Sequence, residues 1–138
     1  MRVRHDGVSL RDLGYRTVGL DDGWQECGPD GYHDPTTGEP RVNAKFPDLG
    51  AMTAYARARN VSMGWYGNNC GCHGKDDVGR YGQDAVATVK YGFTGTKIDS
   101  CGPETNSTVW RLALDNASAV HGDGTRIVLE NCRNYAFT

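Results

Sequence analysis

The sequence predicts an α/β fold with a parallel sheet, built from about four β/α units of a (β/α)8 TIM barrel. Short apolar runs alternate with helical segments of about 10 to 15 residues, which is typical of βαβ units. Polar residues directly follow each apolar run, as in barrel enzymes, whose sites lie at the carboxyl ends of the strands. A closed barrel needs eight units and about 250 residues. The 138 residues therefore hold part of one.

The first half of the chain predicts two helices, one strand and a long loop. Residues 3–13 have the pattern of a short helix, and the apolar run at 17–20 has the length of a strand. Residues 28–46 are rich in Gly, Pro, Asp and Thr and predict a polar loop. A Pro-Asp pair then introduces a helix over 50–59, whose apolar positions recur at helical spacing.

The second half alternates strands and helices. Apolar runs predict strands at 61–66, 93–98 and 126–129, separated by helices at 79–91 and 104–121. The carboxyl ends of parallel strands meet at one edge of a sheet, so the residues that follow the four strands should surround one site. In chain order these residues are Asp21, Asp22, Asn68, Asn69, Cys70, Asp99 and Glu130.

Composition excludes several classes of function. The net charge of −2, from 15 basic and 17 acidic residues that are well mixed, offers no electrostatic footprint for nucleic acid or an anionic membrane. No stretch approaches the ~20 apolar residues of a membrane span, and the first residues have no apolar signal-peptide core. No glycine-rich phosphate loop follows a strand, which argues against a nucleotide-binding open sheet.

The five cysteines favour disulfides over a metal site. The chain has no C-x-x-C pair, and its histidines do not fall at zinc-finger spacing. Cys70 and Cys72 lie too close in sequence to pair easily with each other, and both are expected near Cys101. Three Asn-x-Ser/Thr triplets fit the glycosylation pattern. Together these features favour an oxidising compartment.

The adjacent carboxylates Asp21 and Asp22, with Trp24 close behind, form the most informative short motif. Neighbouring side chains on a strand point to opposite faces, so both carboxylates can share one wet cavity only where the chain leaves the strand. Acidic acceptors beside an aromatic ring suit a pyranose, whose hydroxyls donate hydrogen bonds and whose C–H face stacks. Taken alone, however, the pair is better explained as an Asx-turn or a helix N-cap.

Four motifs occur in order along the chain. Residues 19–24 read GLDDGW, 45–48 read KFPD, 64–67 read GWYG and 96–101 read TKIDSC. This succession resembles the glycoside hydrolase family 27 α-galactosidases of the melibiase clan. Those enzymes carry Asp-Asp-x-Trp after the second barrel strand, Phe-Pro before the next helix, Gly-x-Tyr on the third strand and Lys-x-Asp-x-Cys on the fourth. The resemblance extends from about His5 to Cys132 and implies barrel strands 2 to 5.

The resemblance implies a role for each residue that matches a family motif. Asp99 matches the nucleophile of a retaining glycosidase, and Lys97 matches a ligand of a sugar hydroxyl. Asp21 and Asp22 match the carboxylates that hold the galactose hydroxyls, while Trp24 lies in the neighbouring pocket wall. A lysine beside Asp99 favours the charged nucleophile, and a negative pocket favours the cationic oxocarbenium over the neutral substrate.

The same resemblance implies how the nucleophile loop is supported. Tyr66 matches a tyrosine beside the nucleophile, and Cys101 matches one half of a disulfide to the loop after the third strand. Its partner is Cys72 or Cys70, which leaves Cys27 near the remaining one for a second bridge.

The chain departs from the family pattern at its ends. The family's acid/base Asp follows a later strand and its first strand comes earlier, so we expect residues 1–138 to be a single fragment of the catalytic barrel, without the first and later strands. Many relatives carry Cys-Glu-Trp after the fifth strand, where this chain reads LENC at 129–132. That difference leaves the choice between galactose and N-acetylgalactosamine open, with Glu130 either lining the pocket or capping the next helix.

The expected function is hydrolysis of terminal α-D-galactosyl residues by a retaining exo-glycosidase, with an α-galactoside as its partner and no metal or organic cofactor. Alternatives on the same scaffold are an α-N-acetylgalactosaminidase and a β-L-arabinopyranosidase. A non-catalytic galactose-binding relative is the alternative from another class. The expected location is secreted, extracellular or lysosomal and vacuolar, and the oligomeric state is open. The isolated fragment is expected to be inactive and prone to aggregate, because half a barrel exposes sheet edges.

Overall fold

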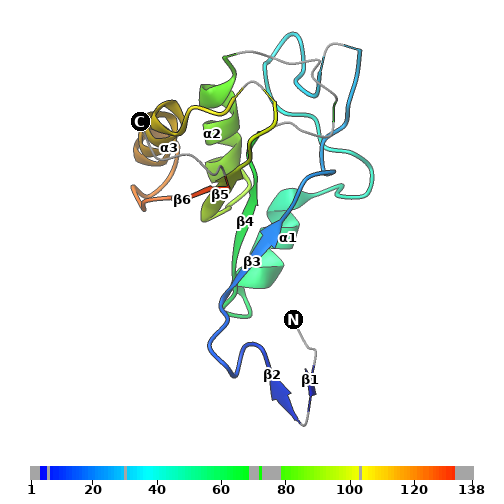
Figure 1. The fold of residues 1–138 in the computed structure, drawn as a ribbon, viewed down its shortest axis with the longest axis vertical. Helices are drawn as coiled ribbons and strands as arrows, with labels where there is room; N and C mark the ends of the chain where they lie inside the picture. Colours follow the sequence, from blue (N-terminus) through cyan, green and yellow to red (C-terminus); the bar gives the residue numbers. More distant parts are fainter. Residues whose placement is uncertain are drawn as a thin grey trace.

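The structure, a computed structural model, describes residues 4–5, 7–29, 31–68, 72, 79–102 and 104–132. A four-stranded parallel sheet forms its centre, with its strands in sequence order (Figure 1). The strands are β3 (Thr17–Leu20), β4 (Ser62–Tyr66), β5 (Gly95–Ile98) and β6 (Val128–Asn131). The helices that connect them are α1 (Leu49–Arg57), α2 (Tyr81–Lys90) and α3 (Ser107–His121). This arrangement confirms the predicted α/β class with a parallel sheet.

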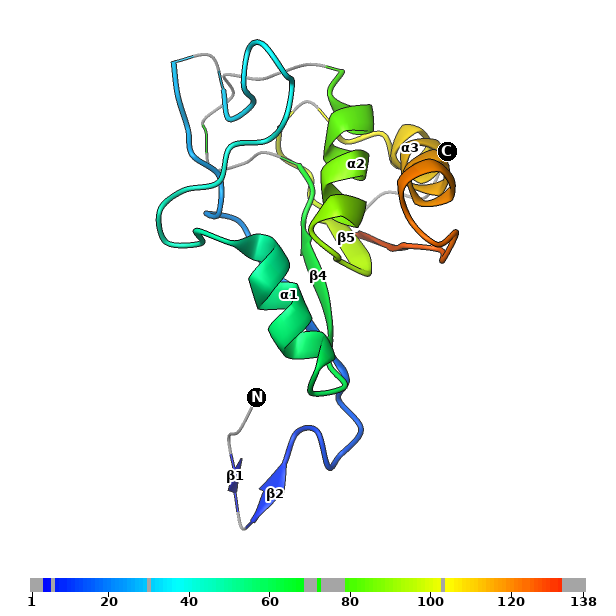
Figure 2. The same cartoon turned by 180° about the vertical axis from the view of Figure 1, so that it is seen from behind.

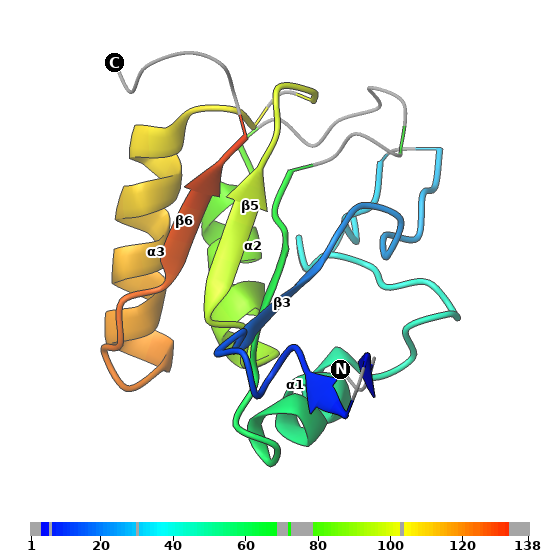
Figure 3. The ribbon, with the colours of Figure 1, turned by 60° about the horizontal axis from the view of Figure 1, so that its bottom comes forward.

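The three helices lie on one face of the sheet, as Figure 3 shows. Each helix carries the chain back to the start of the next strand, so all four strands run in the same direction and end at the same edge. In register, Tyr66 of β4 lies beside Lys97 of β5, and Lys97 lies beside Glu130 of β6. The fold therefore places a layer of polar side chains along the carboxyl edge of the sheet.

Buried aromatic rings fill the space between the sheet and its coverings. Trp65 of β4 stacks on Trp24 on one side, with ring centroids 4.5 Å apart, and on Phe93 on the other, at 4.9 Å. A second cluster, which includes Trp110 and Leu114 of α3 and Ile98 of β5, packs beneath the other half of the sheet. These clusters hold the strand ends, and hence the polar edge, in a fixed arrangement.

Two of the helices begin at residues whose side chains cap them. The Asp48 carboxylate accepts a hydrogen bond from the Ala51 amide at 2.8 Å, which confirms the helix start predicted at the Pro-Asp pair. Asn106 caps α3 by accepting from the amides of Thr108 and Val109 at 3.0 and 3.1 Å. The caps set where each β-to-α loop stops and its helix starts.

The helix predicted over residues 3–13 is wrong. Strands β1 (Arg4–His5) and β2 (Val8–Ser9) pair antiparallel and lie apart from the parallel sheet (Figure 2). Gly7 has a φ of +85°, a left-handed conformation that interrupts a right-handed helix. Asp12 then bonds back to Ser9, with the Ser9 amide donating to its carboxylate at 2.9 Å, and this local turn competes with a helix.

The last strand lies further along the chain than predicted. The sequence places it at 126–129, whereas β6 begins at Val128 and ends at Asn131. Glu130 is therefore a strand residue paired in register with Lys97, and the expectation that it follows the strand is corrected. Within the described part of the chain, no helix has both the length and the apolar character that crossing a membrane requires.

Candidate functional site

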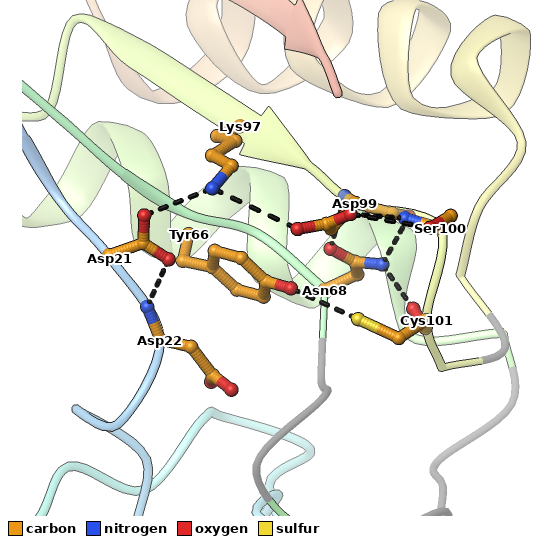
Figure 4. Close-up of polar contacts among 8 residues, drawn as sticks. All are labelled: Asp21, Asp22, Tyr66, Asn68, Lys97, Asp99, Ser100 and Cys101. Atoms are coloured by element: carbon orange, nitrogen blue, oxygen red, sulfur yellow. Dashed lines mark hydrogen bonds and ion pairs between the residues drawn. The ribbon is translucent and has the colours of Figure 1, made fainter. Parts of the chain in front are cut away.

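The carboxyl edge of the sheet brings together four of the residues that the sequence singles out. Asp21 directly follows β3, Tyr66 ends β4, Lys97 lies near the end of β5 and Asp99 comes just after it. Figure 4 shows their side chains facing one another although they come from three strands. The parallel topology alone explains this, since it makes consecutive strands end side by side.

Lys97 lies between two carboxylates. Its Nζ is 2.9 Å from Asp21 Oδ2 and 3.8 Å from Asp99 Oδ2, and it lies 5.1 Å from the centre of the Tyr66 ring. The hydrogen bond to Asp21 is the main reason that the pKa of Lys97 is raised above its ordinary value. The ammonium group therefore stays charged and draws Asp21 and Asp99, which are far apart in sequence, toward one point.

Asp21 and Asp22 have different surroundings. The pKa of Asp21 is lowered, first by a hydrogen bond from the Asp22 amide at 2.8 Å and then by Lys97. Asp22 Oδ1 is buried and has no hydrogen-bond partner in the structure. A buried acceptor without a donor is costly, so a donor supplied from outside the fold would be bound favourably there. Asp21 is thus hydrogen-bonded within the protein, whereas Asp22 Oδ1 has no partner there.

Tyr66 is buried beneath these carboxylates, with 2% of its surface exposed. Burial raises the pKa of its phenol, and the negative charges of Asp99, Asp22 and Asp21 raise it further. The hydroxyl is therefore neutral and able to donate. It lies 3.2 Å from Cys101 Sγ, and because Cys101 is disulfide-bonded, the sulfur accepts and the phenol donates.

Asn68, which the sequence places after β4 without a role, is fully buried at this edge. Its amide bonds to backbone groups of the segment that carries Asp99. Figure 4 shows these bonds from Asn68 to Asp99 and Cys101. The only signal in the sequence is an asparagine after a strand, which equally indicates a turn. Asn69, its neighbour, lies outside the described residues.

Trp24, which is expected in a pocket wall, is found in the buried core. Only 1% of its surface is exposed, because one face stacks on Trp65 and Tyr32 meets its edge at 5.6 Å. Its indole N–H donates to the Tyr66 carbonyl at 3.1 Å. Trp24 therefore supports the end of β4 from within the core, and its ring offers no surface on which a ligand could stack.

The disulfides resolve one of the alternatives that the sequence leaves open. Cys72 is bonded to Cys27, with their Cα atoms 5.3 Å apart, which is the second bridge expected for Cys27 and excludes Cys72 as the partner of Cys101. Cys101 is itself disulfide-bonded, and Cys70 lies outside the described residues. Cys132 is an exposed free thiol. The bridge joins the loop after β3 to the segment after β4.

A cavity of about 560 Å³ runs along the face of the sheet that the helices leave uncovered. Asp21, Lys97 and Glu130 line its end at the carboxyl edge, and the rest of the lining is mixed, from glycines and threonines of the strands to Trp65 and Arg126. The lining does not include Asp99, Asp22 or Tyr66. Glu130 lies on β6, the strand beside β5, and therefore belongs to the same charged edge.

The charged edge offers hydrogen-bond acceptors, one ammonium donor and one neutral phenol. Such a set suits a polyhydroxylated ligand, whose hydroxyls both donate and accept. Asp99, whose side chain is 29% exposed, is available as a nucleophile or a general base. Among the residues that the structure describes, no group of three or more His, Cys, Asp or Glu is arranged to hold a metal ion.

No protein-family model and no curated protein matches the chain. Its fold is similar to that of a solved protein from Bacteroides fragilis NCTC 9343 described as a "putative alpha-galactosidase", with a TM-score of 0.57 and 21% sequence identity. The match covers 88% of this chain and 26% of that protein, so the chain spans about a quarter of its length. At this identity the likeness establishes a shared fold.

Proposed function

We propose that the chain is the nucleophile-bearing part of a retaining glycoside hydrolase that acts on terminal α-D-galactosyl residues. The observation that carries the proposal is the array at the sheet edge, in which Lys97 lies between Asp21 and Asp99 above the neutral phenol of Tyr66. The structural likeness to a protein described as a "putative alpha-galactosidase" agrees with this assignment. In the proposal, the sheet is strands 2 to 5 of a (β/α)8 barrel, and its uncovered face is the barrel interior.

The proposed reaction begins with attack by Asp99. One of its carboxylate oxygens forms a bond to the anomeric carbon while the bond from that carbon to the leaving-group oxygen breaks. The leaving oxygen keeps the bonding electron pair and takes a proton from a carboxylic acid that another strand would supply. Water then attacks the same carbon, loses its proton to that carboxylate, and releases Asp99 as a carboxylate.

The other residues at the edge stabilise the positive charge that develops on the sugar. Asp21, Asp22 and Asp99 make the pocket negative, which favours an oxocarbenium-like transition state over a neutral substrate. Lys97 prevents these carboxylates from repelling one another and donates to a sugar hydroxyl. Asp22, whose Oδ1 has no partner in the fold, accepts from another hydroxyl.

The nature of the sugar defines the alternatives within this proposal. An α-N-acetylgalactosaminidase or a β-L-arabinopyranosidase would use the same nucleophile and differ at the substituents of C2 and C5. Glu130 lines the same cavity as Lys97, and in the proposal it contacts a ring substituent. A comparison of kcat/KM on the three aryl glycosides separates these activities.

The proposed location is an oxidising compartment. The Cys27–Cys72 bridge joins residues 45 apart in the sequence, and a second disulfide includes Cys101. Such bridges persist in secreted, extracellular or lysosomal proteins and are rare in the reducing cytosol.

The test is substitution of the proposed nucleophile in the full gene product. We expect Asp99→Ala to lower turnover of an aryl α-galactoside by more than about 10³-fold, because no covalent intermediate can form. Galactose binding, measured by calorimetry, should remain detectable. Added azide should restore turnover and give the β-galactosyl azide, since a small anion can attack from the space that the carboxylate leaves.

The matched control is Asp115→Ala, which removes an exposed carboxylate of α3 that pairs with Arg111. Its turnover should equal that of the unmodified protein. Unchanged turnover in Asp99→Ala would remove Asp99 from the nucleophile role. Galactose binding without any turnover by the unmodified protein would instead support a non-catalytic sugar-binding protein.

A further inference from the structure

Asn68 occupies the junction between the ends of β4 and β5. It follows Tyr66 by two residues, and none of its surface is exposed. Gly67 allows this close approach, because a Cβ there would collide with the methyl group of Thr96 on β5. The Gly67 amide also donates to the Lys97 carbonyl at 2.7 Å. The backbone thus delivers the Asn68 side chain directly beneath the segment that carries Asp99.

The Asn68 amide bonds to three backbone groups of that segment. Its Oδ1 accepts from the Asp99 amide at 2.8 Å, and its Nδ2 donates to the carbonyls of Asp99, at 3.0 Å, and Cys101. The partners fix which end of the amide is which, since the reverse orientation would point N–H at N–H and oxygen at two carbonyls. Beyond the end of β5, the backbone is therefore hydrogen-bonded to this one buried side chain, as the strand itself is bonded to its neighbouring strands.

These bonds determine the direction of the Asp99 carboxylate. With the backbone from 99 to 101 held, Asp99 Oδ1 accepts from the Ser100 amide at 2.7 Å, and Oδ2 faces Lys97. The three bonds from Asn68 thus form a clamp on residues 99 to 101. At the far end of this clamp, the sulfur of Cys101 accepts a hydrogen bond from the Tyr66 hydroxyl. Rotation of this short turn would move the carboxylate, the lysine contact and the phenol contact together.

We propose that Asn68 is a positioning residue that holds the Asp99 backbone so that its carboxylate faces the bound substrate. The inference rests on the proposed function only for its consequence in catalysis; the clamp itself is a property of the fold. Asn68 does not contact the cavity, so it acts through Asp99. Misplacement of a reacting group by about 1 Å costs about 10²-fold in rate.

The test is Asn68→Asp in the full gene product, because this change keeps the shape and replaces the neutral amide, with its N–H donors, by a carboxyl group. The ionised carboxylate can still accept from the Asp99 amide but places oxygen against two carbonyls. We expect kcat on an aryl α-galactoside to fall by about 10²-fold. KM should change by less than about threefold, because Asp21, Asp22 and Lys97 lie on segments that Asn68 does not hold.

The pH dependence of the variant provides a readout that general destabilisation would not give. When the introduced carboxyl is protonated, it regains one O–H donor for the two carbonyls. The ratio of kcat between Asn68→Asp and the unmodified protein should therefore rise toward one as the pH falls. Asn106→Asp is the matched control, since Asn106 caps α3 through its oxygen alone and a carboxylate can serve equally.

Hydrogen exchange separates failure of this inference from failure of the proposed function. In Asn68→Asp, the Asp99 amide should exchange faster at neutral pH while the amides of α3 keep their protection. If the Asp99 amide exchanges faster in the variant but the unmodified protein has no glycosidase activity, the clamp is supported and the proposed function is wrong. If the Asp99 amide exchanges faster and kcat is unchanged, the positioning role of Asn68 is wrong. The role is also wrong if kcat falls only in proportion to the folded fraction.

If Asn68→Asp fails to fold, a second variant, Asn68→Ser, tests the same proposal. Asn68→Ser retains a small hydroxyl that can donate to one carbonyl, and it introduces no charge. We expect it to lower kcat by about tenfold with KM unchanged, between the unmodified protein and Asn68→Asp. Full activity in Asn68→Ser would overturn the proposal.

Discussion

At the scale of single residues, the site depends on how one ammonium group is shared. Lys97 Nζ is closer to Asp21 than to Asp99, at 2.9 against 3.8 Å, so Asp21 takes the stronger bond and Asp99 keeps a carboxylate oxygen that faces the site. The two acids therefore have different tasks although both face the same lysine. Asp21 fixes the lysine, and in the proposed mechanism Asp99 reacts.

Removal of the lysine charge tests this division of tasks. Lys97→Met keeps the length of the side chain but leaves Asp21 and Asp99 to repel each other in one pocket. We expect kcat/KM on an aryl α-galactoside to fall by about 10²-fold, as for loss of a single preorganised electrostatic group. The measurement is steady-state kinetics in the full gene product.

Lys90→Met is the control for that change. Lys90 forms an ion pair of similar length with Glu39, at 2.8 Å, but both side chains are more than half exposed and lie far from the sheet edge. Exposed pairs contribute about 0–1 kcal/mol, so activity and stability should hardly change. Equal losses in the two variants would show that Lys97 has no special part in the site.

At the scale of elements, a buried polar cluster joins the loop after β3 to α2 and to the segment before α3. His33 Nε2 lies 2.8 Å from Asp84 Oδ1, and the Tyr32 hydroxyl donates to Asp84 Oδ2 at 3.0 Å. Glu104 faces Asp84 as well and accepts from the Arg80 amide at the start of α2.

Burial, and then the neighbouring Asp84 carboxylate, raise the pKa of Glu104 to about 8. In the unfolded chain its pKa is near the ordinary 4.5. The folded state therefore binds a proton more tightly than the unfolded state between these two values. The stabilisation from this proton is complete below pH 4.5 and is lost as the pH rises through about 8.

Glu104→Gln should remove this pH dependence. In the unmodified protein we expect the free energy of unfolding to fall between pH 4.5 and 8 by at least about 1.4 kcal/mol more than in the variant, which is the equivalent of one pKa unit. The glutamine can still accept from the Arg80 amide. Denaturant unfolding at several pH values measures the difference.

Glu26→Gln is the control for the pH series, since Glu26 is exposed and lies in no buried cluster. It should follow the unmodified protein at every pH. Identical pH profiles for Glu104→Gln and the unmodified protein would show that Glu104 is ionised in the fold at neutral pH.

At the scale of the whole molecule, the Cys27–Cys72 bridge closes the long loop after β3 onto the segment after β4. A crosslink between residues 45 apart stabilises the fold by about 4 kcal/mol in the chain-entropy account. The double change Cys27→Ser and Cys72→Ser should lower the free energy of unfolding by up to that amount. Denaturant unfolding under oxidising conditions measures it.

Cys132→Ser is the matched control for this experiment, because Cys132 is an exposed free thiol. Its denaturation midpoint should equal that of the unmodified protein. A double variant as stable as the control would mean that the loop is held by the aromatic and polar contacts of Tyr32 and His33 without the bridge.

The parallel sheet was predictable because its pattern is local. Each apolar run and each amphipathic helix can be recognised within about ten residues, and β3 is found where the sequence places it. The N-terminal segment has no such pattern over enough residues. There, the left-handed Gly7 and the Ser9–Asp12 turn decide in favour of a hairpin.

The sequence by itself determined the order of strands and helices and the residue types that follow each strand. It could not determine which of those side chains face solvent, because exposure depends on contacts between segments far apart in the chain. Trp24 became core because Trp65 lies beneath it, and Cys72 pairs with Cys27 because two loops meet. Asn68 became a clamp because β5 ends just above it. Tertiary packing decided these roles, since only packing brings the partners within hydrogen-bonding or bonding distance.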